Sequence, residues 1–265
     1  MNRSYFSLYP SAFSLGKFAP LVLAVLLLAA LVARAENTNN LTDAEIQGRQ
    51  LARQLCEQPA QSFTNTGTLK VRAKGSGWVE ARIKCALNTD SPTHWQIVYY
   101  CDSPTNTNPA NASILAISHS GQQPNEYFWR EPGAAQPVKL TGAETMKPFA
   151  GTDFWLADLG LEFFHWPDQK ILPKTTALVR SRAYTLLEST NPHPAAGGYS
   201  RVRTWIDAET SGILKAEAYD AQGSKLKYFE PKSFKKVNGQ YELQEMEIDN
   251  LQTGSITRLE FDLKK

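Results

Sequence analysis

The sequence predicts a mainly β, α+β domain built on one antiparallel sheet of about ten or eleven strands. Three observations predict it: short strand patterns separated by turn signals, one helix pattern that precedes them, and an aromatic segment between two sets of strands. That number of strands is enough for a sheet to curl. No Gly/Ser linker or internal repeat divides the chain, so we expect residues 36–265 to form a single domain.

A helix is predicted to begin at Thr42. Thr42 and Glu45 have the spacing of a capping box, in which each residue satisfies a backbone N–H of the first helical turn. Apolar residues then recur at helical spacing as far as Leu55, and Pro59 ends the pattern. We expect the apolar stripe of this helix to lie on the sheet.

The strand patterns fall into two sets. In the last pattern, Leu259, Phe261 and Leu263 alternate with charged residues, as in a sheet with one wet and one buried face. Asn238-Gly239 is a strong signal for a two-residue hairpin. The predicted strands span residues 66–73, 78–87, 94–101, 112–118 and 126–130 in the first set, and 178–189, 199–207, 214–219, 225–236, 240–249 and 256–263 in the second.

Between the two sets, six of the eighteen residues from Phe149 to Trp166 are aromatic. Each aromatic side chain buries about 150 to 250 Å², so this segment needs either a core or an apolar ligand to cover it. Both interpretations stay open: the segment fills the open side of a curved sheet as core, or it contacts a ligand. The candidate ligand-binding residues are Phe149, Phe154, Trp155, Leu159, Phe163, Phe164 and Trp166.

A short motif lies inside the aromatic segment: Gly151-Thr152-Asp153-Phe154, followed by Asp158-Leu159. Strand motifs at residues 184–189, 202–207 and 214–227 come after it. In this order the motifs resemble the outer membrane lipoprotein-sorting protein family, relatives of the periplasmic lipoprotein carrier LolA, with Thr152 in place of the family's serine. The resemblance extends from about Ala143 to Leu263.

The resemblance implies a strongly curved sheet that forms an open, incomplete barrel, with helices over its concave face and an apolar cavity between. It also implies a non-catalytic, monomeric protein that binds or carries lipid or lipoprotein acyl chains in outer membrane lipoprotein sorting. Gly151, Asp153 and Asp158 are the residues that match the family motif, and no lipoprotein-handling role is carried over to them: Gly suits a turn and Asp a helix cap. The alternative is an envelope-stress sensor or regulator that binds a membrane protein partner through the same fold.

The N-terminus has the pattern of a secretory signal peptide. Arg3 and Lys17 precede an apolar run over residues 21–33, which ends in Ala33-Arg34-Ala35. Thirteen apolar residues are fewer than the roughly 20 that a spanning helix needs. We therefore expect cleavage after Ala35 and a periplasmic protein.

Charge argues against a nucleic-acid partner. Removal of residues 1–35 takes three of the 28 basic side chains and none of the 26 acidic ones, leaving a formal net charge of −1. We expect local basic groups such as Lys232, Lys235 and Lys236 to lie on the solvated face of a strand.

No enzyme motif is present. The four histidines, at positions 94, 119, 165 and 193, have no metal-binding spacing, and Gly75-Ser76-Gly77 lies in a hairpin turn without a strand-to-helix elbow. Phosphate loops and dinucleotide fingerprints are also missing. We expect no catalytic residue, metal or cofactor.

Three cysteines follow the predicted cleavage site, so at most one disulfide could form within the chain. Cys85 and Cys101 lie on successive predicted strands, but the hairpin between them would centre near Asp90, which does not place them opposite each other. Cys56 lies in the predicted helix. No C-x-x-C spacing exists, which excludes the usual thiol oxidoreductase motif.

Overall fold

The computed structural model describes residues 41–57, 62–102, 111–121, 123–237 and 239–263. The predicted signal peptide lies outside these residues. The compact unit from Asp43 to Lys265 contains the sheet and its helices. In chain order the elements are α2 (Asp43–Cys56), β1 (Phe63–Arg72), β2 (Val79–Ser91), β3 (His94–Cys101), β4 (Ser113–Ser120), β5 (Glu126–Arg130), β6 (Val138–Leu140), the 3-10 helix η2 (Gly142–Thr145), α3 (Leu156–Leu159), the 3-10 helix η3 (Glu162–His165), β7 (Asp168–Leu172), β8 (Tyr184–Thr190), β9 (Arg201–Asp207), β10 (Ile213–Tyr219), β11 (Lys225–Val237), β12 (Gln240–Asn250) and β13 (Ser255–Phe261).

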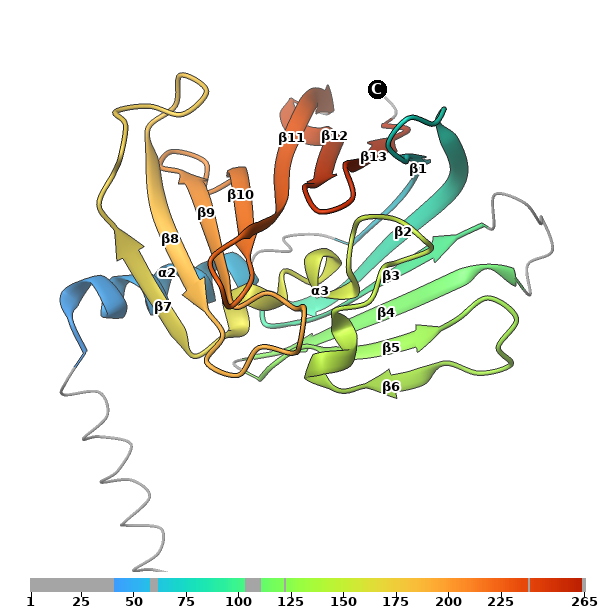
Figure 1. The fold of residues 1–265 in the computed structure, drawn as a ribbon, viewed down its shortest axis with the longest axis horizontal. Coiled ribbons are helices and arrows are strands. Elements are labelled where there is room, and N and C mark those ends of the chain that lie inside the picture. The colour runs from blue at the N-terminus through green and yellow to red at the C-terminus, as the bar shows by residue number, and fades with distance from the viewer. Residues whose placement is uncertain (1–40, 58–61, 103–110, 122, 238, 264–265) are drawn as a thin grey trace, which may run out of the picture. The chain divides into compact units, whose positions relative to one another are not determined.

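The thirteen strands of the described residues all belong to one antiparallel sheet (Figure 1). The order is β6-β5-β4-β3-β2-β1-β13-β12-β11-β10-β9-β8-β7, so every neighbouring pair except β1 with β13 is also consecutive in the chain. In the register of that central pair, Leu69 lies opposite Leu259, and both are buried. Short connections therefore build two strand sets, and the β1–β13 ladder joins them.

The mainly β antiparallel prediction is confirmed, and two of its details need correction. The described residues form thirteen strands, and the two that were not predicted are β6 and β7. β6 has only three residues, and β7 buries the polar Gln169, so neither shows a clear apolar–polar alternation. The sheet is open, as expected, since its edge strands β6 and β7 do not pair with each other, but it is not strongly curled and does not form the expected incomplete barrel. Figure 1 shows the strands β2–β5 crossing β8–β10 at a large angle, as the twist of a long open sheet requires.

The local predictions agree well with the structure. The predicted helix is α2, and the turn after β1 contains Gly75 with a φ of +78°, a left-handed conformation that glycine adopts without strain. The predicted strand at 178–189 begins later, at Tyr184, because Arg180 and Ser181 both have positive φ. Backbone in that conformation cannot continue a strand ladder.

The segment from residue 141 to 167, here called the insert, links one edge of the sheet to the other. It leaves β6, passes through η2, α3 and η3, and enters β7. Phe149 and Phe154 pack in one core cluster with residues of β1–β5, while Phe163 and Phe164 pack in a second cluster with residues of β8–β11. The insert therefore covers a face of the sheet and separates two cores on that face.

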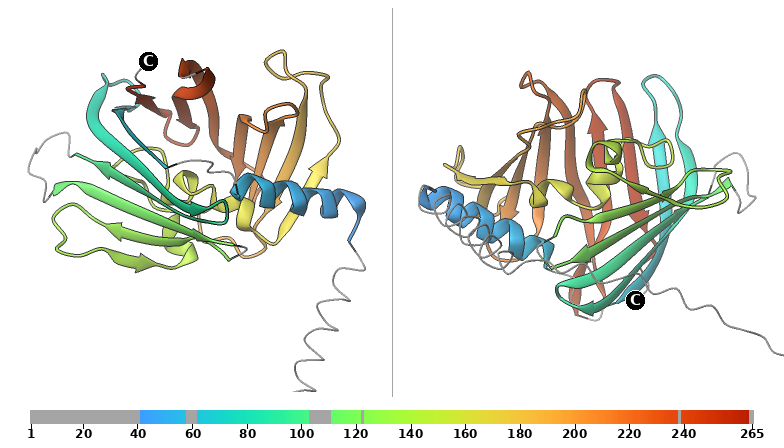
Figure 2. Two further views of the ribbon diagram at one scale, coloured as in Figure 1. Left: turned by 180° about the vertical axis from the view of Figure 1, so that it is seen from behind. Right: turned by 90° about the horizontal axis from the view of Figure 1, so that it is seen from below.

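Helix α2 packs on β7 and on the insert (Figure 2). Ala52, on its buried side, belongs to the same cluster as Phe163 and Phe164. Gly48 allows the close approach: a Cβ at this position would lie 2.6 Å from the backbone nitrogen of Lys170 in β7. The helix thus covers an edge strand that would otherwise be available for pairing with another chain.

The three cysteines carry free thiols. Cys85 lies opposite Tyr99 and Cys101 opposite Ile83, so the register keeps the two sulfurs out of directly facing positions. Both are buried in the first core cluster, where they pack as small apolar side chains.

The Gly48 contact is testable by replacing this residue with alanine. Alanine favours a helix by about 1 kcal/mol over glycine, but the added methyl group would collide with the β7 backbone. We expect Gly48→Ala to lower the free energy of unfolding by about 1 to 3 kcal/mol in chemical denaturation. Gly142→Ala is the control, because nothing lies within 4 Å of the added Cβ. Equal stability of the two variants would contradict the close packing of α2.

Candidate functional site: an apolar cavity and a polar latch

A cavity of about 370 Å³ lies between the insert and the strands β9–β12. The insert contributes Phe154, Leu159 and Phe163, and β3 contributes Tyr99. The space exists partly because Ala216 and Ala218 of β10 are short and leave the sheet surface uncovered. The remaining lining residues are Asp158, Leu161, Tyr199, Val202, Gly212, Ile213, Lys227, Phe229, Pro231, Phe234, Leu243, Met246 and Ile248.

The other predicted aromatic residues pack around the cavity without lining it. Phe149 is buried against Tyr99 and Trp129, with ring centroids 6.1 and 5.7 Å away in edge-on geometry. Phe164 and Trp166 are buried in the cluster that contains α2. Aromatic spacing in the sequence cannot separate these positions, because core and cavity side chains have the same chemistry.

Trp155 has a different environment, since its ring stacks on Tyr199 with centroids 4.4 Å apart. The ammonium group of Lys227 lies 3.7 Å from the centroid of the Trp155 ring, within the range of a cation–π interaction. Trp155 therefore supports the cavity wall by holding Tyr199 and Lys227, two of the lining residues.

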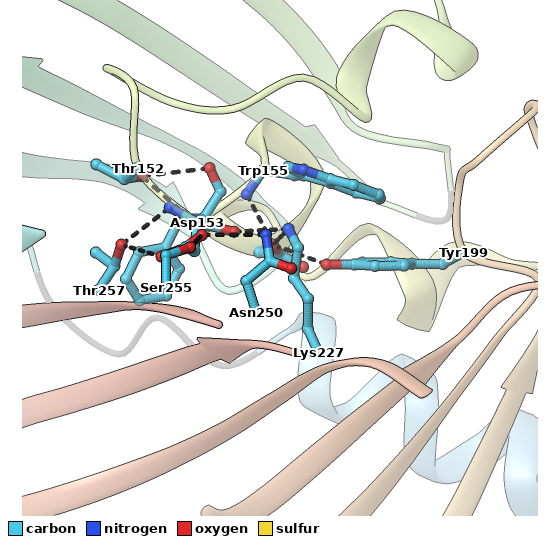
Figure 3. Close-up of polar contacts among 10 residues, drawn as sticks. Thr152, Asp153, Trp155, Tyr199, Lys227, Asn250, Ser255 and Thr257 are labelled. Carbon is cyan, nitrogen blue, oxygen red and sulfur yellow. Dashed lines mark hydrogen bonds and ion pairs between the residues drawn. The ribbon is translucent and has the colours of Figure 1, made fainter. Parts of the chain in front are cut away.

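Asp153 fastens the insert to the middle of the sheet (Figure 3). Its Oδ2 accepts a hydrogen bond from Thr257 Oγ1 at 2.8 Å, and its Oδ1 accepts from Ser255 Oγ at 2.5 Å and Asn250 Nδ2 at 3.1 Å. The backbone N–H of Asp153 in turn donates to Thr257 Oγ1 at 2.9 Å. We call Asp153, Asp158, Lys227, Asn250, Ser255 and Thr257 the polar latch.

The second half of the polar latch is centred on Lys227, which is only 3% exposed. Its Nζ donates to the backbone oxygen of Asp153 at 2.6 Å and lies 3.4 Å from Oδ2 of Asp158. Burial lowers the pKa of Lys227 to about 8, and the nearby Asp158 carboxylate opposes that shift. Asp158 Oδ2 also accepts hydrogen bonds from Tyr199 OH and from the Trp155 backbone N–H. The buried charge is therefore paired inside the protein.

Gly151 and Thr152 shape the turn that presents Asp153. Gly151 has a φ of +74°, a left-handed conformation that favours glycine. Space is not the reason for glycine here, because nothing lies within 4 Å of an added Cβ. Thr152 Oγ1 accepts a hydrogen bond from the N–H of Phe154, while the Phe149 N–H donates to the Phe154 oxygen at 2.7 Å. The family motif thus places Gly151 in the turn, Asp153 in the latch and Asp158 both in the latch and at the cavity wall.

A second, partly buried polar cluster joins α2, β4 and η3. His165 Nε2 lies 3.5 Å from Cys56 Sγ, and the His119 ring lies 5.4 Å from that of His165. Burial raises the pKa of Cys56 to about 12 and lowers that of His165 to about 4, so at neutral pH the pair consists of a thiol and a neutral imidazole. Such a thiol is a poor nucleophile. No group of three or more His, Cys, Asp or Glu side chains among the described residues could hold a metal ion.

Glu162 belongs to the same region of the insert. It accepts a hydrogen bond from Tyr127 OH at 2.9 Å, yet burial raises its pKa to about 7. Its ionised form is therefore disfavoured relative to a carboxylate in water. Glu162 cannot be recognised from local sequence patterns, because its burial and its hydrogen bond with Tyr127, 35 residues away, depend on tertiary structure.

The open antiparallel sheet, its face-covering insert and its apolar cavity define a LolA-like fold, and known structures agree. A DUF1329 family protein from Desulfovibrio piger is 17% identical over 83% of this chain and 92% of its own, with a TM-score of 0.66. A putative outer membrane lipoprotein-sorting protein domain from Vibrio parahaemolyticus is 19% identical over 82% and 91%, with a TM-score of 0.65. A LolA superfamily protein from Nitrosomonas europaea is 17% identical over 82% and 91%, with a TM-score of 0.56.

A family model described as "uncharacterized protein" matches residues 100–264, and the chain belongs to that family. The match covers β4–β6, the whole insert and β7–β13. Among curated proteins, none matches the chain. Within the described residues, no helix is both long enough and apolar enough to cross a membrane.

Removal of the Asp153 carboxylate should release the insert. Asp153→Ala leaves the buried Thr257 hydroxyl without its acceptor, so we expect a loss of about 2 to 4 kcal/mol in the free energy of unfolding. Hydrogen exchange should accelerate in residues 149–166 more than in the sheet. As a control, Asp262→Ala removes an exposed carboxylate and should change stability by less than about 1 kcal/mol. Unchanged exchange in the insert would show that the latch does not hold it.

The pKa of Glu162 predicts a pH dependence of stability. Because its pKa is raised on folding, the folded protein binds this proton more tightly, and stability falls as pH rises from about 4.5 to about 7. The Glu162→Gln variant lacks this titration. Its free energy of unfolding relative to wild type should increase by roughly 1 to 3 kcal/mol between pH 5 and pH 8, measured by denaturant titration. If the difference in free energy of unfolding between Glu162→Gln and wild type were the same at pH 5 and pH 8, folding would not raise the pKa of Glu162, and the prediction would be wrong.

Proposed function

We propose that this protein binds the acyl chains of lipids or lipoproteins in the cavity under the insert, and that it carries them in the periplasm as part of outer membrane lipoprotein sorting. The apolar cavity is the observation that carries the proposal. Its volume of about 370 Å³ lies within the roughly 300–1,000 Å³ usual for small-molecule sites. The name of the similar Vibrio parahaemolyticus domain supports the same role.

The lining suits a hydrocarbon chain. Leu159, Phe163, Ala218, Met246 and Ile248 present apolar atoms to the cavity, so an acyl chain meets no unpaired polar group along them. Transfer of each methylene from water into such a site is favourable by about 0.8 kcal/mol. Ten methylenes would thus gain about 8 kcal/mol, which corresponds to micromolar affinity at most, because the costs of association are still to be subtracted. A carrier needs affinity in such a range because it must also release its cargo.

Some of the candidate residues would contact the acyl chain directly, and others hold the cavity wall in place. Phe154, Leu159 and Phe163 would contact the acyl chain from the insert, while Gly151, Asp153 and Asp158 hold the insert in position. Phe149, Trp155, Phe164 and Trp166 would act indirectly, through the core packing described above. This role requires no catalytic group. The protonated thiol of Cys56, beside the neutral imidazole of His165, would be a poor nucleophile.

Export is part of the proposal. Cleavage of residues 1–35 would release a protein that begins at Glu36, and the apolar run that precedes Ala35 is the motivation. Intact mass spectrometry of the protein isolated from the periplasm tests this directly. A mass that still includes residues 1–35 would contradict processing at this position.

Native mass spectrometry of the exported protein provides the first test of ligand binding. We expect a bound acyl species after gentle purification, its loss on delipidation, and its return when a fatty acyl probe is added. A protein that is folded, empty and unable to take up any acyl probe would overturn the proposed function.

Filling the cavity should block binding without removing any polar group. Ala216→Leu and Ala218→Leu would extend side chains from β10 into the space that an acyl chain would occupy. We expect at least a tenfold loss of affinity for a fluorescent fatty acid, since about 1.4 kcal/mol corresponds to a factor of ten. Ala116→Leu, on β4 and away from the cavity lining, is the matched control. Wild-type affinity in both β10 variants, with melting temperatures unchanged, would place the ligand elsewhere.

A further inference from the structure

The cavity has one buried end and one exposed end. At one end, Lys227 of the polar latch and its neighbour Ala218 are buried. At the other end, Phe234, near the end of β11, is 53% exposed. Phe234 lies opposite Leu243 in β12, and both line the cavity. Access to the cavity therefore lies toward the end of the β11–β12 hairpin.

The buried end offers no partner for a charged headgroup. Lys227 already contacts Asp158, the Asp153 carbonyl and the Trp155 ring. Asp158 accepts two further hydrogen bonds, from Tyr199 OH and the Trp155 backbone N–H. A second charge placed there would be buried without a free counter-ion, which is strongly unfavourable. A bound amphiphile must therefore leave its polar group at the exposed end, beside the hairpin.

Two residues extend the same face of the hairpin beyond the cavity. Lys236 lies opposite Tyr241, two pairs further along than Phe234 and Leu243 and therefore on the same face of the hairpin. The Lys236 ammonium lies 5.9 Å from the centroid of the Tyr241 ring. Tyr241 is 76% exposed, more than any other large hydrophobic side chain among the described residues. The hairpin rim, defined as Phe234, Lys236 and Tyr241, thus combines two exposed aromatic rings and an amine.

Lys236 has no ion pair among the described residues, in contrast to Lys225, Lys227 and Lys232 of the same strand. Lys235 donates to the backbone oxygen of Leu263. Lys232 on the same strand pairs with Glu230 and Glu247, and Lys225 pairs with Glu217. No carboxylate of the described residues lies within ion-pair distance of Lys236. An exposed tyrosine beside an unpaired lysine matches the chemistry of a bilayer interface, where aromatic rings lie at the headgroup level and amines meet anionic lipids.

We propose that the hairpin rim docks on an anionic lipid surface, so that an acyl chain can pass between the bilayer and the cavity without crossing water. This inference rests on the proposed function for its cargo, but it concerns a separate surface. The surface is continuous with the cavity through Phe234, and its charge is complementary to anionic headgroups. One lysine near such a surface contributes only modestly, so the docking is weak and reversible.

Vesicle sedimentation tests the docking. The exported protein is mixed with vesicles of phosphatidylcholine, or of phosphatidylcholine with phosphatidylglycerol, and the bound fraction is measured. We expect stronger binding to the anionic vesicles, a loss of about fivefold in Lys236→Gln on those vesicles alone, and a loss of about fivefold or more in Tyr241→Ser on both. Tyr241 does not line the cavity, so Tyr241→Ser should keep wild-type affinity for a soluble fatty acid probe.

The matched control is the double variant Val79→Ser with Leu251→Ser, which removes two exposed apolar side chains near the turns that follow β1 and β12. It should bind vesicles like wild type. Equal loss in this control, equal binding by Tyr241→Ser, or no vesicle binding by wild type would each overturn the rim proposal. A change of oligomeric state in Tyr241→Ser, with vesicle binding unchanged, would make the rim a contact between copies of the chain. In all these cases uptake of the soluble probe decides the proposed function independently.

Discussion

The carboxylate of Asp153 is the constraint on which the arrangement of the insert depends. Both of its oxygens accept hydrogen bonds from side chains at the junction of β12 and β13, and its backbone oxygen accepts one from Lys227 in β11. Because the insert runs from one edge of the sheet to the other, it has no ladder of its own to fix its position. A satisfied polar cluster in the middle of the sheet supplies that position, since a buried hydrogen-bonded group tolerates little displacement.

The cavity follows from where this cluster lies. The polar latch holds the insert at the end of the cavity where Lys227 lies. Ala216 and Ala218 have short side chains, so the facing surface of β10 leaves space for the cavity. On either side, the aromatic clusters around Phe149 and Phe164 pack tightly and prevent the insert from collapsing into the gap. The space thus lies between two well-packed cores, as is usual for ligand sites that exist before the ligand binds.

The same arrangement gives the cavity a direction. Charge is paired and buried at the latch, whereas the opposite end of the cavity leads to exposed aromatic rings on the β11–β12 hairpin. A single-chain amphiphile would meet apolar walls first and, last, a polar cluster whose groups already bond one another. Such a gradient favours entry of the hydrocarbon end and retention of the polar end in water.

What the sequence by itself determined was local: alternation within strands, glycine at left-handed turns, the boundaries of α2, and the presence of an aromatic segment between two strand sets. These features depend on neighbours a few residues apart, so they can be recognised from the residues alone. Two strands were not predicted, because β6 has only three residues and β7 buries Gln169 and so lacks an apolar–polar alternation. Whether each aromatic residue lines the cavity or fills a core was decided only by tertiary structure. So was the partnership of Asp153 with Thr257, 104 residues away. The physical reason is that hydrogen bonds and packing across a sheet depend on which distant strands become neighbours, and the β1–β13 ladder that brings them together is itself a long-range contact.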